Sequence, residues 1–134
     1  MEKLYNFIDG KLVEPGKSNY LPNINPAEGV AYNLVPDSDA QDVAEAVKAA
    51  RFAFASWPDT PLDQRATILS KIADLIDRDL DQLALAESID QGKPFKLAKS
   101  MDIPRASANM RFYATASMHF ASESHHMEGE AVNY

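Results

Sequence analysis

The sequence predicts an α+β fold in which two N-terminal β-hairpins are followed by four to five α-helices. Residues 4–35 alternate apolar and polar side chains between turn residues, which is typical of short strands. From Pro36 onward, apolar residues recur at spacings of three and four, which indicates amphipathic helices. The chain has 134 residues, 46% of them hydrophobic, with no repeat and no low-complexity linker. We therefore expect residues 1–134 to form one modest core without an internal domain boundary.

The predicted strands cover residues 4–8 and 11–13 in the first hairpin, and 20–25 and 30–35 in the second. Asp9-Gly10 separates the first pair and supplies the positive φ angles that a tight turn requires. Pro22 lies within the third strand and cannot donate a ladder hydrogen bond. That strand should therefore be an edge strand or begin after Pro22.

Turn and capping residues predict where the helices begin and end. Ser38 and Gln41 fit a capping box for the first helix, which Trp57-Pro58 ends. Thr60 is the predicted cap of the second helix, with Pro61 as its first residue. The third helix, residues 80–89, is predicted to stop at Gly92.

Two prolines mark the last helical segments. Pro94 begins one of them, and Pro104 would break it unless a new helix starts near Asp102, which could cap that helix. Strands between Ser38 and Ala121 would contradict these assignments. The predicted core lies on the apolar faces of the helices and comprises Val43, Val47, Phe54, Trp57, Leu69, Ile72, Ile76 and Leu83.

Composition excludes several classes of function. The net charge is −7 and no basic run offsets it, so neither nucleic acid nor an anionic membrane is an expected partner. The absence of cysteine excludes a disulfide framework, a thiolate metal site, an iron–sulfur cluster and a cysteine nucleophile in this chain. No window approaches about 18 consecutive apolar residues, and the N-terminus does not resemble a signal peptide. We therefore expect a cytoplasmic protein.

The chain offers few candidates for chemistry. No two glycines lie close enough for a dinucleotide or phosphate loop, so no residue is predicted to bind a nucleotide cofactor, and none to be catalytic. After Ala121 the sequence shows no periodicity. There His125, His126, Glu128 and Glu130 are better explained as an exposed polar tail than as a metal site, which stays an alternative.

Arg105 is the residue whose position is hardest to explain by a purely structural role. It is predicted in the first turn of the last helix, where the helix dipole disfavours a cation, directly after Pro104. The side chain is either simply exposed or positioned to bind a carboxylate through two hydrogen bonds.

Three segments together resemble the N-terminal regions of aldehyde dehydrogenases. They are Asn25-Pro26-Ala27-Glu28-Gly29, then Ala49-Ala50-Arg51-x-Ala53-Phe54 with Trp57 and Arg65, then Glu87-Ser88-x-Asp90-x-Gly92-Lys93-Pro94. The stretch Met101-Asp102-Ile103-Pro104-Arg105, followed by Asn109, Arg111, Phe112 and Tyr113, is similar to the subgroup that oxidises 2-hydroxymuconic and 2-aminomuconic semialdehydes. The resemblance runs from about Phe7 to Tyr134.

The resemblance implies that the chain is the N-terminal part of the α/β aldehyde dehydrogenase fold, contributing hairpins and a helical layer to the NAD-binding domain. Full members are several times longer and carry the catalytic cysteine and the cofactor loop beyond the region that Tyr134 would reach. We therefore expect the parent enzyme to oxidise a small-molecule aldehyde with NAD or NADP and to be a homo-oligomer. This chain alone should be inactive, with the remainder of the enzyme as its partner and part of its surface exposed without it.

The resemblance also implies two sites. Arg105 would bind the carboxylate of a semialdehyde substrate. Backbone oxygens of Ile24 and Asp90 would hold a monovalent cation, since hard cations favour oxygen ligands. The alternative is that Ile24 is a core strand residue and Asp90 caps a helix end.

A function of another class stays open on the sequence. The chain could be a free-standing helical interaction module that binds a partner through an exposed apolar face. A continuous downstream coding region containing a cysteine would favour the enzyme, and a stop codon after Tyr134 would favour the module.

Overall fold

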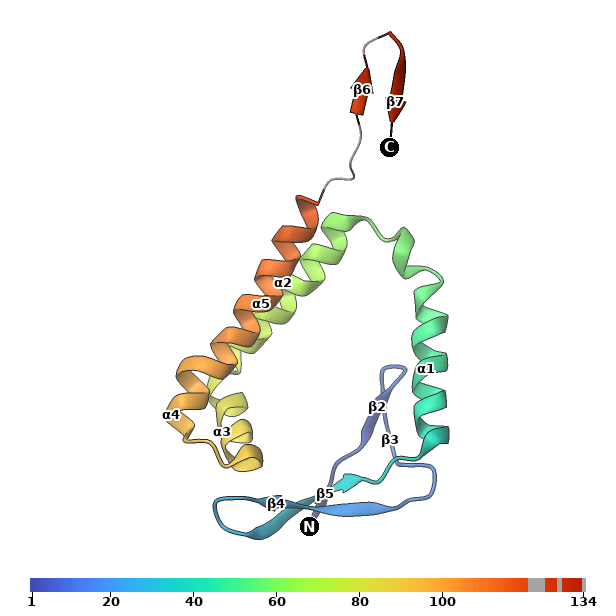
Figure 1. The fold of residues 1–134 in the computed structure, drawn as a ribbon. Coiled ribbons are helices and arrows are strands. Elements are labelled where there is room, and N and C mark those ends of the chain that lie inside the picture. Colours follow the sequence, from blue (N-terminus) through green and yellow to red (C-terminus); the bar gives the residue numbers. More distant parts are fainter. Residues whose placement is uncertain (121–124, 128, 134) are drawn as a thin grey trace.

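The computed structural model describes residues 1–120, 125–127 and 129–133. Figure 1 shows strands followed by helices, with a last strand pair beyond α5. The elements are β1 (Glu2–Lys3), β2 (Asn6–Ile8), β3 (Lys11–Val13), β4 (Tyr20–Asn25), β5 (Val30–Pro36), α1 (Ala40–Phe54), η1 (Trp57–Asp59), α2 (Leu62–Arg78), α3 (Leu80–Gln91), α4 (Phe95–Leu97), η2 (Ala98–Asp102), α5 (Ile103–Met118), β6 (His125–Met127) and β7 (Ala131–Asn133). The order confirms hairpins followed by helices, and no strand occurs within residues 38–120.

Both predicted hairpins are present. β2 pairs with β3 across Asp9 and Gly10, whose φ angles of 53° and 74° match a type I′ turn. β4 pairs with β5, and β4 is an edge strand of a three-stranded sheet in the order β1-β5-β4. Pro22 therefore lies at an edge, as predicted. The parallel pairing of β1 with β5 was not predicted, because a two-residue strand carries no periodicity.

The first two helices begin one residue later than predicted. The N-cap of α1 is Asp39, whose carboxylate accepts hydrogen bonds from the backbone of Gln41 and Asp42. The predicted cap Ser38 instead forms a hydrogen bond with Asn6 of β2. Similarly, Thr60 is not the cap of α2, because it ends η1 and leaves Pro61 as the N-cap.

The chain stays helical from Phe95 to Met118, through Pro104. The five-residue π-helix η2 lies directly before α5, where Pro104 lacks a backbone donor. Asp102 occupies the N-cap position of α5, as predicted, but its side chain forms no capping hydrogen bond and instead accepts one from Lys93 Nζ at 2.7 Å. Pro104 therefore lies in the first turn of a new α-helix, as predicted, and the wider turn of η2 joins this helix to α4 without a break.

Small residues form the core. α2 and α5 pack side by side (Figure 1), and the buried side chains of the helices are Ala66, Ala73, Ala84, Ala98, Ser107 and Ala114. Ser107 Oγ donates to the carbonyl oxygen of Ala73 at 3.4 Å. Short side chains let these two backbones approach closely, so small residues make the contact in place of the large side chains of the predicted core.

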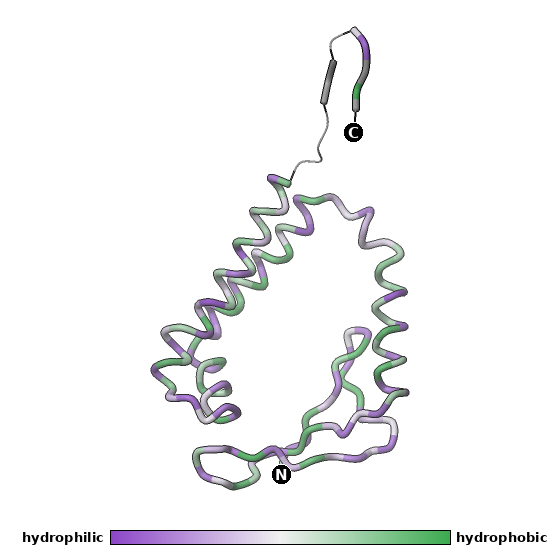
Figure 2. Tube along the Cα trace, viewed as in Figure 1, coloured by the Kyte–Doolittle hydropathy of each residue, from purple (hydrophilic) through white to green (hydrophobic). Residues whose placement is uncertain are grey.

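The predicted core is therefore wrong for most of its members. Val43 is 57% exposed and Phe54 is 65% exposed, and Val47, Trp57, Ile72 and Leu83 are also exposed. Leu69 and Ile76 are half-buried. Figure 2 shows apolar and polar residues alternating along α1 and α2. Both helices are amphipathic as predicted, and β2 contacts α1, but the large apolar residues of α1 stay exposed.

The segment after Ala121 is not irregular throughout, because β6 and β7 form an antiparallel pair. The possible metal ligands His125, His126 and Glu128 have side chains outside the described residues, so that alternative stays a prediction. In the part of the chain that the structure describes, no helix is long and apolar enough to cross a membrane.

Candidate functional site

Arg105 lies on the first turn of α5 and is exposed. Among the described residues it forms neither an ion pair nor a side-chain hydrogen bond. Arg111, on the same helix, is paired with two aspartates. Its Nη1 lies 2.8 Å from Asp74 Oδ1, and its Nη2 donates to Asp77, so it ties α5 to α2. Arg105 thus has its guanidinium donors available, whereas Arg111 is engaged in the fold.

The helix start orients Arg105. Pro104 precedes it within the first turn, and Lys93 holds Asp102 just before that turn. Lys93 Nζ also lies 3.7 Å from Glu87 on α3. The pKa of Lys93 is raised, chiefly by its hydrogen bond to Asp102. The base of α5 is therefore fixed by contacts that do not use the Arg105 side chain.

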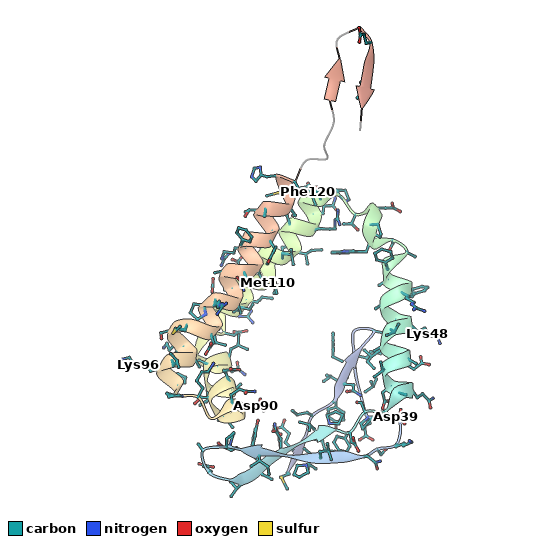
Figure 3. All side chains as sticks on the ribbon, viewed as in Figure 1. Asp39, Lys48, Asp90, Lys96, Met110 and Phe120 are labelled. Atoms are coloured by element: carbon teal, nitrogen blue, oxygen red, sulfur yellow. The ribbon has the colours of Figure 1, made fainter. Side chains whose placement is uncertain are left out.

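Asp90 lies near the end of α3, facing the sheet (Figure 3). Its Oδ1 accepts hydrogen bonds from Asn23 Nδ2 and from the Tyr32 hydroxyl, each at 2.9 Å. Asn23 Nδ2 also donates to the Tyr32 oxygen at 2.9 Å. Hydrogen bonds from Asn23 and then Tyr32 lower the pKa of Asp90, because they favour its charged form. Asp90 is thus an anionic link between α3 and the strands β4 and β5.

This network adjoins one of the two residues of the predicted cation site and contains the other. Asn23, the neighbour of Ile24, holds Asp90, and a β-bulge lies between Asn23 and Ile24. Asp90 is in the last turn of α3, where backbone carbonyls lack helical partners. Neither structural alternative matches the structure, since the Ile24 side chain is 44% exposed and Asp90 binds the sheet.

Two of the segments that carry the family resemblance also meet in space. Gly92 ends α3 with φ of 69°, and a Cβ placed on it would lie 3.1 Å from Cβ of Pro26. Ser88 Oγ donates to the Lys93 carbonyl at 2.7 Å. Residues 87–94 therefore pack the end of α3 against the turn at 25–29, which gives the shared motifs a structural role.

The described residues contain no glycine-rich dinucleotide loop. Gly10, Gly29, Gly92 and Gly129 have positive φ and lie at turns or a helix end, far apart in the sequence. None forms a glycine-rich loop between a strand and a helix, the arrangement that cradles a dinucleotide. Within the same residues, no group of three His, Asp or Glu side chains could hold a metal ion.

The sequence did not indicate the partners of Asp90. Asn23 and Tyr32 lie 67 and 58 residues away from it, so no local spacing connects them. Arg65 was noted only as part of a motif, although its Nε is buried without a hydrogen-bond partner in the described structure. Such contacts between distant segments leave no periodic signal in the sequence.

The model of the aldehyde dehydrogenase family matches residues 13–134. The chain is 44% identical over 125 residues to 2-aminomuconic semialdehyde dehydrogenase of Homo sapiens, an alignment that covers 93% of this chain and 25% of that protein. It is 41% identical over 109 residues to acetaldehyde dehydrogenase 2 of Cupriavidus necator. This alignment covers 81% of this chain and 22% of that protein. The chain spans about a quarter of the length of these relatives.

Solved structures share the fold. The NAD+ complex of aldehyde dehydrogenase from Bacillus cereus matches with a TM-score of 0.91 and 31% identity, covering 98% of this chain and 27% of that one. A putative aldehyde dehydrogenase from Burkholderia cenocepacia matches with a TM-score of 0.89 and 28% identity. This match covers 96% of this chain and 26% of that one. The same arrangement of hairpins and helices thus occurs within chains about four times as long.

Proposed function

From the premise that this chain belongs to the aldehyde dehydrogenase family, we propose that it forms the N-terminal quarter of an NAD-dependent enzyme that oxidises an aldehyde to an acid. The solved NAD+ complex of a relative supports the choice of cofactor. Residues 1–134 would be one segment of the NAD-binding domain. We further propose that the whole enzyme is cytoplasmic and homo-oligomeric, which fractionation and size-exclusion chromatography of the full-length protein test.

The proposed substrate is a semialdehyde with a carboxylate at the end opposite the aldehyde. The observation that carries this proposal is Arg105, an exposed guanidinium without a partner among the described residues. Several relatives at 39–44% identity are named for 2-aminomuconic semialdehyde, an aldehyde that carries a carboxylate. A planar guanidinium binds a carboxylate through two parallel hydrogen bonds, which a lysine cannot do.

This chain contributes binding and orientation. Arg105 holds the carboxylate of the substrate, and the rigid first turn of α5 sets the direction of the guanidinium, which lowers the entropy cost of binding. Because the chain contains no cysteine, the nucleophile must come from the remainder of the enzyme. NAD, when bound there, accepts the hydride.

A monovalent cation is proposed to bind the backbone oxygens of Ile24 and Asp90. The β-bulge beside Ile24 and the position of Asp90 in the last turn of α3 support this site. Replacing Na+ and K+ by a bulky organic cation should lower the thermal midpoint of the full-length enzyme. No change at constant ionic strength would contradict the site.

The substitution Arg105→Ala in the full-length enzyme tests the substrate. Charge-assisted hydrogen bonds contribute about 1.5–3 kcal/mol, so kcat/KM for a carboxylated aldehyde should fall roughly ten- to a few-hundred-fold. A neutral aldehyde of similar length should lose little. Arg51→Ala, at an exposed arginine of α1, is the matched control. Equal losses on both substrates would mean that Arg105 supports the fold instead.

A further inference from the structure

An open groove lies between the start of α2 and the end of α5. Figure 3 labels Phe120, one of its lining residues, at that end of the helix pair. Its volume is about 440 Å³, and it is lined by Leu62, Arg65, Tyr113, Ala116, Ser117 and Phe120. It lies near the opposite end of α5 from Arg105, so it is separate from the proposed substrate contact. The groove combines one cationic side chain with apolar and aromatic walls.

Arg65 is the unusual residue of this groove. Its side chain is half-buried, and its Nε is fully buried without a hydrogen-bond partner in the described structure. The rest of its guanidinium also forms no ion pair or hydrogen bond with described residues. A buried donor without a partner destabilises a fold, more so in a charged group, because it has lost its hydration. Arg78 and Arg111, in contrast, are both paired with aspartates.

The walls of the groove are exposed to solvent. Phe120 is 84% exposed and Tyr113 is 64% exposed, and Leu62 at the start of α2 is also exposed. Large apolar side chains gathered around a charge favour an occupant that covers the apolar surface and supplies an oxygen acceptor. An acidic side chain with an apolar neighbour has both properties.

We propose that this groove binds a carboxylate side chain flanked by apolar residues, presented by a polypeptide segment from outside residues 1–134. The cationic Arg65 selects an anionic group in the occupant. The apolar walls select apolar side chains beside that group. The length of the relatives identifies a source, because the same fold occurs in solved chains about four times as long. In that setting the Arg65 donors find their acceptor and Phe120 is covered.

The 134-residue chain itself provides the test. The probe is the peptide N-acetyl-Leu-Glu-Leu-amide, titrated into ¹⁵N-labelled chain while the Nε–H signals of the arginines are followed by NMR. The Arg65 signal should move saturably, with a dissociation constant on the order of 1 mM. The matched peptide N-acetyl-Leu-Gln-Leu-amide should bind at least about tenfold more weakly, because it lacks the charge. No saturable movement, or equal affinity for both peptides, would overturn the proposal.

Variants locate the binding. Arg65→Met keeps an apolar stem and should abolish binding, and Arg65→Lys keeps the charge but loses the planar donor pair, so affinity should fall about tenfold. Arg51→Met, at an exposed arginine of α1, should bind like the unmodified chain. If sodium acetate matches the affinity of the acidic peptide, the site recognises a free carboxylate and the polypeptide occupant is wrong. The titration of the unmodified chain decides the matter even if a variant fails to fold.

Discussion

The hydroxyl of Tyr32 on β5 lies 2.9 Å from Oδ1 of Asp90 near the end of α3 and donates a hydrogen bond to it. Asn23 of β4 donates to the same oxygen. The Asp90 carboxylate therefore joins α3 to two strands that lie 67 and 58 residues away in the sequence. Asp90 also belongs to the proposed cation site, and a β-bulge lies between Asn23 and Ile24, the other proposed ligand.

Replacing Tyr32 by Phe should weaken this link without altering the packing of the ring. A hydrogen bond to a charged acceptor contributes up to a few kcal/mol, and solvent exposure of Asp90 reduces this to about 1 kcal/mol. The thermal midpoint should fall by roughly 3–5 °C in calorimetry. Tyr5→Phe, at an exposed tyrosine, is the control and should leave the midpoint unchanged.

The pH dependence of stability should reveal Asp90. Its pKa is lowered in the fold by hydrogen bonds from Asn23 and Tyr32, so the stabilisation is fully present above its ordinary pKa of 3.8 and is lost as pH falls through the lower folded value. The free energies of unfolding of the unmodified chain and of Asp90→Asn, measured in urea, should therefore differ most above about pH 5 and converge as pH falls through the folded pKa of Asp90. A constant difference over this range would contradict the assignment.

Two glycines allow a matched test of the contact between α3 and the turn at 25–29. Gly92 and Gly29 have nearly equal φ angles of 69° and 70°, but only Gly92 would place a Cβ within 3.1 Å of Pro26. Gly29→Ala should cost about 1 kcal/mol in unfolding free energy from backbone strain alone. Gly92→Ala should cost about 2–3 kcal/mol, since Pro26 must also shift. Equal costs in urea denaturation would mean that the Pro26 contact contributes nothing.

The contact between α2 and α5 should not tolerate a larger side chain at Ala73. This alanine is fully buried, and Ser107 of α5 donates to its carbonyl. Ala73→Leu should destabilise the chain by about 1–3 kcal/mol through overpacking. The control is Ala44→Leu on the exposed surface of α1, which should change unfolding free energy little. Similar losses for both, measured by urea unfolding, would argue against close packing at Ala73.

Isolated residues 1–134 should not bind NAD measurably. No glycine-rich loop at the start of a helix is present in the described ranges, so the phosphates have no cradle. Isothermal titration calorimetry of the chain with NAD should give only heats of dilution up to about 1 mM, a concentration that detects weak binding. A micromolar dissociation constant would contradict this.

Local features of the fold could be predicted from the sequence, because a few adjacent residues determine them. Asp9-Gly10 predicted the first hairpin turn, and Gly92 predicted the end of α3, since positive φ angles are a local property of the chain. The change from alternating to helical periodicity near Pro36 likewise separated strands from helices. The motifs at 25–29 and 87–94 carried the family resemblance, although the sequence did not indicate that they contact each other.

The positions of caps and of the π-helix depended on a choice between adjacent residues. Ser38 and Asp39 are both good caps, and the structure uses Asp39 because the Ser38 hydroxyl is engaged with Asn6 of β2. Similarly, Pro104 allowed either a break or a widened turn. A contact outside the turn itself, that of Lys93 with Asp102, accompanies the second outcome.

The sequence by itself thus determined the two hairpins, the main helices and the family, and it identified Arg105 and Asp90 as candidates. Only the tertiary structure decided which faces are covered. Periodicity shows that α1 and α2 have apolar faces, but not which neighbour reaches them, and the close approach of α2 and α5 selects alanines such as Ala73 for the core. The partners of Asp90 and the unpaired Nε of Arg65 also follow from chain segments that meet only after folding. Contacts of that kind depend on distances in space, which local spacing in the sequence does not encode.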